Sequence, residues 1–173
     1  MKRTLTNPLH RFTARVRQDW LDYNGHMNVA YYTQVFDQAG DSWVTAAGMG
    51  EAYTRETGNS WMILETHTTF QHEAVAEDLL VVSSQILALD NKRVHLFQIM
   101  ENDEGQRLSS NEEIILHVDL RQRRATPFPP QVMNRLRILY QQQAEQEWPP
   151  EAGRSVAMGA RRPVKRPAGG DTD

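Results

Sequence analysis

The sequence predicts an α+β domain in which one long amphipathic helix packs on an antiparallel sheet. Between residues 29 and 47 apolar side chains recur at every third or fourth position, which is the period of a helix. Between residues 61 and 120 several segments alternate apolar and polar side chains, which is the period of a strand. Short turn-forming stretches separate those segments, and strands joined by short turns run antiparallel.

The elements follow one another in a simple order. Strands are predicted over residues 12–18, 61–72, 79–89, 93–100 and 113–120, with turns at 90–92 and 102–105. The long helix begins at Val29, where Asn28 is a suitable N-cap, and ends near Gly48 or Gly50. A second helix starts near Gln131, after the proline-rich residues 127–130.

Length and composition fit a single globular domain. The chain has 173 residues, of which 39% are hydrophobic and 24% charged, and its net charge of −3 argues against a general nucleic-acid-binding protein. The chain contains no cysteine, which excludes a disulfide framework, a thiolate nucleophile and cysteine-ligated zinc. The sequence shows no secretory signal and no membrane span, so we expect a cytoplasmic protein without membrane contact.

The C-terminal part of the chain differs in composition from the rest. From Trp148 onward proline, glycine, alanine and arginine dominate and large apolar residues almost disappear. We therefore expect residues 1–147 to form the domain and residues 148–173 to be a disordered or loosely packed tail.

The segment before the long helix has the pattern most suggestive of chemistry. Asp22, Asn24 and His26 stand at alternate positions immediately before the helix start. The free N–H groups of a helix N-terminus stabilise an oxyanion, while a neighbouring carboxylate or imidazole handles a proton. The Asn24–Gly25 pair alone would predict a hairpin turn, but the helical period of the residues that follow argues against one.

In this segment the sequence resembles the hotdog-fold thioesterases. The spacing Asp22-x-Asn24-x-His26-x-Asn28 is similar to the motif that opens the central helix in plant acyl-ACP thioesterases, and Asp22 falls where the 4-hydroxybenzoyl-CoA thioesterase branch carries its catalytic aspartate. Residues 70–73 resemble a segment that carries a further active-site glutamate in the plant enzymes. The resemblance covers about residues 10–140. It implies a curled antiparallel five-stranded sheet wrapped around a long central helix.

A narrower resemblance links five short blocks to the betainyl-CoA thioesterase branch of carnitine breakdown. These blocks are residues 22–28, 65–67, 90–95, 116–119 and 127–130. The resemblance implies an acyl-CoA thioesterase with betainyl-CoA as the favoured substrate. We expect no cofactor and no metal, because the six histidines lack a zinc-binding spacing and no phosphate-binding glycine loop is present. The alternatives are a thioesterase for another short-chain or aromatic acyl-CoA and a non-catalytic acyl-CoA-binding protein.

With the resemblance, the catalytic candidates are Asp22, Asn24, His26 and Glu73. Asp22 would attack the thioester carbonyl or deprotonate the attacking water, although loop aspartates also commonly accept backbone N–H groups. Asn24 would fix the water or the substrate carbonyl, and His26 would donate to the oxyanion or orient Asp22. Both residues also suit a structural role. Glu73 is either an active-site acid or an ordinary exposed strand-end residue.

The substrate-binding candidates are Val29, Tyr32, Trp43, Trp61, Glu65, Lys92 and Arg93. The N–H of Val29 would polarise the thioester oxygen. Aromatic side chains around Glu65, a buried acid in need of a partner, would bind a trimethylammonium group. Tyr32 and Trp43 suit the helix core equally well.

Positive charge is concentrated at the predicted strand ends. Lys92 and Arg93, together with Arg121, Arg123 and Arg124, form a basic cluster suited to CoA phosphates. Solvated surface charges are the alternative interpretation.

One copy of such a sheet leaves an edge strand unpaired and a ligand groove half built. We therefore expect a homodimer or higher homo-oligomer with the site at the interface.

Overall fold

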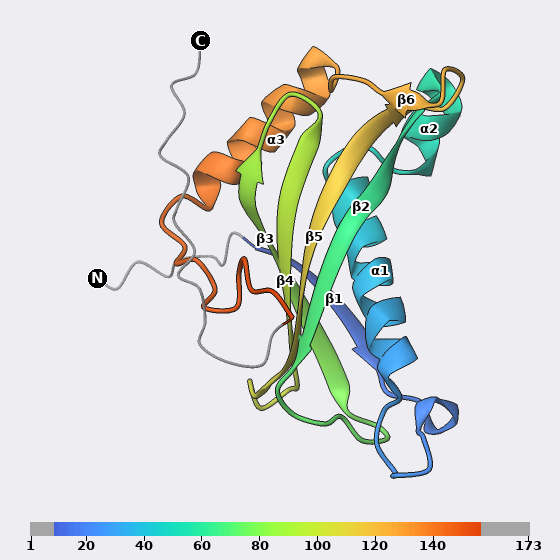
Figure 1. Cartoon of the computed structure of the whole chain (residues 1–173), viewed down its shortest axis with the longest axis vertical. Coiled ribbons are helices and arrows are strands. Elements are labelled where there is room, and N and C mark those ends of the chain that lie inside the picture. The colour runs from blue at the N-terminus through green and yellow to red at the C-terminus, as the bar shows by residue number, and fades with distance from the viewer. Residues whose placement is uncertain (1–8, 157–173) are drawn as a thin grey trace.

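An antiparallel sheet and one long helix form the centre of the computed structural model, which describes residues 9–156 (Figure 1). The elements are β1 (His10–Arg15), η1 (Gln18–Trp20), α1 (Val29–Ala46), α2 (Glu51–Thr57), β2 (Asn59–Phe70), β3 (Leu79–Leu89), β4 (Arg93–Glu101), β5 (Arg107–Asp119), β6 (Arg124–Ala125) and α3 (Pro130–Gln142). The strand order is β1-β3-β4-β5-β2, with β6 added to the end of β5, and all pairs are antiparallel. The predicted α+β arrangement is confirmed.

Helix α1 packs along one face of the sheet, which we call the inner face. Asn28 is the predicted N-cap: its side chain accepts the N–H of Ala30 at 3.0 Å. The helix ends where Gly48 adopts a positive φ of 87°, which favours glycine. Its buried residues are Tyr32, Val35, Phe36, Ala39, Gly40, Trp43 and Val44, at the spacing that the sequence predicted. None of the described helices is both long and apolar enough to cross a membrane.

Strand β5 begins at Arg107, six residues earlier than the apolar alternation predicted. Four of the additional residues are polar yet buried, because the neighbouring strands β2 and β4 offer them partners: Ser109, Ser110, Asn111 and Glu112. The hydroxyls of Thr69 and Ser110 lie 2.6 Å apart, and the hydroxyl of Thr68 donates to Asn111 at 2.9 Å. These polar groups can be buried because they are hydrogen-bonded to one another. A strand of this kind has no hydrophobic periodicity, so the sequence pattern does not predict it.

The start of the predicted tail is packed against the sheet and requires a correction. Residues 148–153 lie on the face of the sheet away from α1, which we call the outer face (Figure 1). Both carboxylate oxygens of Glu112 accept the N–H of Gly153, at 2.9 and 2.7 Å, and Arg107 pairs with Glu151 at 2.9 Å. These paired polar groups compensate for the sparse apolar content of the segment. Residues 157–173 lie outside the described part of the chain.

One carboxyl group is enclosed between the sheet and α1. Glu113 is only 5% exposed; one of its oxygens accepts the amide of Asn111 at 3.0 Å, and the other has no partner among the described residues. Burial raises the pKa of Glu113 from 4.5 to about 7, with a smaller contribution from Asp37 and a partly opposing hydrogen bond from Asn111. The side chain is therefore neutral in the folded protein at mildly acidic pH.

This carboxyl group makes stability depend on pH. Below pH 4.5 the carboxyl group of Glu113 is protonated in both the folded and the unfolded protein. Between pH 4.5 and about 7 it ionises in the unfolded chain but stays protonated in the folded one, so the free energy of unfolding falls as the pH rises. At 1.36 kcal/mol per pKa unit the loss is roughly 3 kcal/mol. We predict that Glu113→Gln removes this part of the pH dependence of the unfolding free energy, measured by urea denaturation from pH 4 to 8.

Glu145→Gln is the matched control, because Glu145 is exposed on the surface. Parallel pH profiles for wild type and Glu113→Gln would contradict the assignment.

Candidate active site

A tight turn precedes α1 and carries the predicted catalytic residues. Residues 21 and 27 form an antiparallel bridge, and the N–H of Asp22 donates to the carbonyl of His26 at 3.0 Å. Gly25 has a φ of 85°, as such a turn requires. The hairpin-type turn that the sequence argument rejected is therefore present, because it closes at Met27 before the helix begins.

The carboxylate of Asp22 has two different oxygens. Oδ1 accepts the backbone N–H of Asn24 at 2.7 Å, which is the structural role common for loop aspartates. Oδ2 lies 3.5 Å from the side-chain amide of Asn24 and 3.7 Å from Nδ1 of His26. The side chain of Asp22 is 17% exposed. One oxygen therefore fixes the turn and the other is directed to the imidazole.

His26 lies between two carboxylates. Its Nε2 atom is 4.0 Å from Oε2 of Glu73, while its Nδ1 atom is on the Asp22 side. Asp22, His26, Val29, Tyr32 and Glu73 all line one pocket of about 370 Å³ at the N-terminus of α1. The structure thus brings together five of the residues proposed from the sequence. Asn24 contacts Asp22 but is not among the residues that line the pocket.

Ala74 fixes the position of Glu73. Its carbonyl accepts the N–H of Met27 at 2.7 Å, and its N–H donates to the hydroxyl of Tyr32 at 3.0 Å. Ala74 is fully buried, so both bonds are shielded from water. Tyr32, predicted to bind substrate or to belong to the core, therefore also connects α1 to the segment that carries Glu73.

The beginning of α1 is open to a ligand. Val29 is 58% exposed, and its N–H has no acceptor within the described residues, whereas the N–H groups of Ala30 and Tyr31 bond to Asn28. A free N–H at a helix N-terminus, backed by the helix dipole, suits a developing oxyanion.

The remaining substrate-binding candidates lie elsewhere in the chain. Trp43 is 2% exposed in the core, fourteen residues along α1 from Val29, or roughly 20 Å at the helical rise. Trp61 packs at that same end of the core. Lys92 and Arg93 adjoin the β3–β4 turn, also at the end opposite Asp22 (Figure 1), where Arg93 pairs with Asp90 at 2.6 Å.

Glu65 is neither buried nor near the aromatic residues, which corrects the expectation of a buried acid. It is exposed, and a β-bulge between Ile63 and Glu65 places it opposite Ile114 on the outer face. No cage of Glu65 with Trp43 exists within one described chain, because Trp43 packs beneath the inner face.

A family model described as the thioesterase-like superfamily matches residues 16–136, which is most of the chain. The chain belongs to the thioesterase-like superfamily. The arrangement implied by the resemblance to hotdog-fold thioesterases is thereby confirmed.

Characterised relatives of this thioesterase-like protein share about a third of its residues. It is 34% identical over 154 residues to an L-carnitine dehydrogenase/betainyl-CoA thioesterase of Rhizobium meliloti, covering 88% of this chain but only 31% of the relative. It is 30% identical over 155 residues to a betainyl-CoA thioesterase of Pseudomonas aeruginosa, covering 89% of this chain and 98% of the relative. The chain thus spans about a third of the two-activity relative.

Solved structures show the same fold. A hypothetical protein from Staphylococcus aureus, solved in complex with CoA, aligns with a TM-score of 0.83 at 26% identity over 87% of this chain and 96% of its own. A putative thioesterase from Pseudomonas putida KT2440 aligns with a TM-score of 0.74 at 29% identity over 86% of this chain and 96% of its own.

Residues that the sequence argument did not select also line the pocket of this thioesterase-like protein. Phe70 is 50% exposed, and its ring meets that of Tyr32 edge-on at 5.2 Å. Gln71 and His72 follow it in the pocket wall. All three belong to residues 70–73, the segment that resembles the plant enzymes around their active-site glutamate. The sequence could therefore have predicted that the whole segment lines the site.

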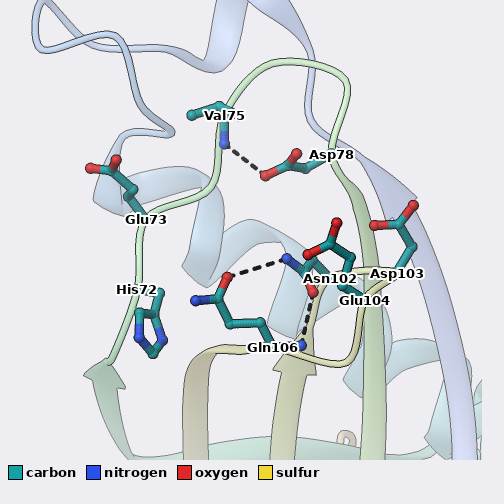
Figure 2. A pocket seen from close by; sticks show the side chains of 8 residues that line it. All are labelled: His72, Glu73, Val75, Asp78, Asn102, Asp103, Glu104 and Gln106. Atoms are coloured by element: carbon teal, nitrogen blue, oxygen red, sulfur yellow. Dashed lines mark hydrogen bonds between the residues drawn. The ribbon is translucent and has the colours of Figure 1, made fainter.

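A second pocket, of about 620 Å³, adjoins the first and shares His72 and Glu73 with it. Figure 2 shows its two sides: the β2–β3 connection with Glu73, and the β4–β5 turn with Asp103 and Glu104. The acidic side chains make its surface attractive to cations. Among residues 9–156 no group of three or more side chains is arranged to hold a metal ion.

Proposed function

We propose that this protein is an acyl-CoA thioesterase that hydrolyses a thioester to a free acid and CoA. The observation that carries the proposal is that Asp22 lines one pocket together with Val29, whose N–H has no acceptor among the described residues. A thioester carbonyl in this pocket would have its oxygen at the helix N-terminus and its carbon toward the carboxylate.

In the proposed reaction a water oxygen replaces sulfur at the carbonyl carbon. Asp22 either removes the proton from that water or attacks the carbon to form an anhydride that water then opens. The negative charge that develops on the carbonyl oxygen is stabilised by the Val29 N–H and the positive end of α1. The C–S bond breaks, and the CoA thiolate leaves and takes up a proton.

His26 and Glu73 have supporting roles in this proposal. His26 contacts Asp22 at 3.7 Å and Glu73 at 4.0 Å, so it can orient the Asp22 carboxylate and exchange a proton with the exposed Glu73. Asn24 acts as a positioning residue, because its backbone N–H holds Oδ1 of Asp22.

Betainyl-CoA is the proposed substrate. The named relatives at 30% and 34% identity support it, as does the acidic pocket that shares Glu73 with the site. A trimethylammonium group cannot donate a conventional hydrogen bond and is recognised by negative charge and aromatic faces. Phe70, which is 50% exposed in the same pocket, offers such a face beside Glu73.

The proposed active form is a homodimer formed through β2. This strand is an edge strand of the sheet. Three of its apolar side chains are exposed: Met62 at 45%, Leu64 at 57% and Phe70 at 50%. An unpaired edge with apolar side chains favours pairing with a second copy. Antiparallel pairing about the middle of β2 would place Trp61 of one subunit near Phe70 of the other.

Asp22→Asn tests the catalytic assignment. The amide keeps the shape of the side chain and an oxygen for the Asn24 N–H, but it removes the base or nucleophile. We predict that kcat on the best acyl-CoA falls about 10²-fold or more, with the fold retained by circular dichroism. Asp41→Asn, at an exposed position of α1, is the control, and near-normal turnover of Asp22→Asn would refute the assignment.

A panel of acyl-CoAs tests the substrate. Betainyl-CoA should be preferred over 3,3-dimethylbutanoyl-CoA, whose tert-butyl group has the same shape without the charge. For each substrate kcat/KM is measured by thiol release and divided by the rate constant of its uncatalysed hydrolysis by hydroxide, because the cation also speeds that reaction. We expect the value for betainyl-CoA to exceed the value for the uncharged analogue about tenfold or more. A ratio near one would exclude recognition of the cation. Binding without thiol release from any acyl-CoA would favour the non-catalytic alternative.

Leu64→Asp tests the dimer. Near the middle of β2 this change would bring two like charges together across the proposed two-fold axis. We predict a dimer for wild type and a monomer for Leu64→Asp by sedimentation velocity. Ile138→Asp, at a 48% exposed position of α3, is the control. A stable and active wild-type monomer would contradict the proposal.

A further inference from the structure

His72 lies where the two pockets near the N-terminus of α1 meet. We call the pocket of about 370 Å³ that contains Asp22 the acyl pocket, and the pocket of about 620 Å³ the acidic pocket. His72 belongs to the β2–β3 connection, its side chain is exposed, and it lines both pockets (Figure 2). Its ring can therefore act on a ligand in either of them.

Three hydrogen bonds to the start of β5 fix the position of His72. The carbonyl of Leu108 accepts the backbone N–H groups of Gln71 at 2.9 Å and of His72 at 3.1 Å. The ring Nδ1 atom lies 2.7 Å from the carbonyl oxygen of Arg107. A carbonyl oxygen only accepts hydrogen bonds, so Nδ1 carries a proton and donates it. In the neutral ring Nε2 is then unprotonated, and it has no partner among residues 9–156.

The charged groups around His72 are mainly acidic. No lysine or arginine lines either pocket in the described part of the chain, and the guanidinium group of Arg107 pairs with Glu151 at 2.9 Å on the outer face. Apart from His72 and His26, the charged side chains that line the two pockets are carboxylates: Asp22, Glu73, Asp78, Asp103 and Glu104. The two imidazoles are thus the groups at which positive charge can arise in the walls of these pockets.

We propose that His72 controls whether the acyl pocket accepts a cationic acyl group, which rests on the proposed function. When the ring is neutral, Glu73 and the acidic pocket attract the cation and the ring of Phe70 contacts it. A proton on Nε2 places a like charge beside the same pocket and repels the cation. Histidine exchanges its proton near neutral pH. The preference for a cationic over an uncharged acyl group therefore rises with pH.

The first test compares kcat/KM for betainyl-CoA with kcat/KM for 3,3-dimethylbutanoyl-CoA by thiol release, from pH 5.5 to 8.5. The ratio of the two values cancels the titration of Asp22, on which both substrates depend. We expect the wild-type ratio to rise about tenfold over this range. In His72→Gln it should stay at the high value, because the amide keeps a donor for the Arg107 carbonyl and does not take up a proton.

Two further variants complete this test. His72→Arg carries a permanent charge and should hold the ratio about tenfold below the wild-type value at pH 8.5. His67→Gln is the matched control, because His67 lies opposite Glu112 on the outer face, and its profile should follow the wild type. A wild-type pH dependence in His72→Gln would overturn the inference and assign the effect to His26. An unchanged ratio at pH 8.5 in His72→Arg would overturn it as well.

The second test does not require hydrolysis and measures the Kd of tetramethylammonium for the full chain by NMR titration. We expect the wild-type Kd to be about tenfold higher at pH 5.5 than at pH 8.5, and the Kd of His72→Gln to change by less than about twofold. Equal wild-type values, or no binding at pH 8.5, would overturn the inference. If the wild type hydrolyses no thioester, the proposed function fails, and a wild-type ratio near one at every pH rejects the cationic substrate. The tetramethylammonium titration still decides the role of His72 in both cases.

Discussion

The two hydrogen bonds to the backbone of Ala74 are the constraint on which the candidate site depends. Its carbonyl receives the N–H of Met27 and its N–H is bonded to Tyr32, so one buried residue joins the turn, the long helix and the β2–β3 connection. Asp22, Val29 and Glu73 each belong to one of these three segments. Because the bonds are shielded from water, their loss would leave buried polar groups unpaired, and the segments are held in one arrangement. The acid residues are thus positioned by apolar packing and backbone contacts some distance from their carboxylates.

The two ends of the sheet have opposite character. Asp22 and Glu73, with the acidic second pocket, occupy one end, whereas the arginines of the β5–β6 turn occupy the other. A two-fold axis through the edge strand would place unlike ends next to each other.

The sequence predicted those elements whose side-chain period is regular. Helix α1 with its Asn28 cap occurs at the predicted position, because its apolar residues repeat at the helical spacing. Glu65 was misplaced because a single bulge at residues 63–65 reverses the alternation of β2 and turns that acid outward. The start of β5 was missed because its buried residues are polar and paired across strands. The grouping of Asp22 with Glu73 was reached only through the family resemblance, since the two residues line one pocket but are 51 positions apart in the chain.

The packing of residues 148–153 on the outer face has a consequence for how the protein is handled. Ala152 covers Leu87 and Phe97, which are 2% and 1% exposed, and Trp148 packs against the same cluster. A fragment that stopped at residue 147 would expose this hydrophobic cluster on the outer face of β3 and β4. It would also leave Glu112 without the N–H of Gly153. Such a fragment would tend to aggregate during purification, so truncated variants for expression should extend at least to residue 153.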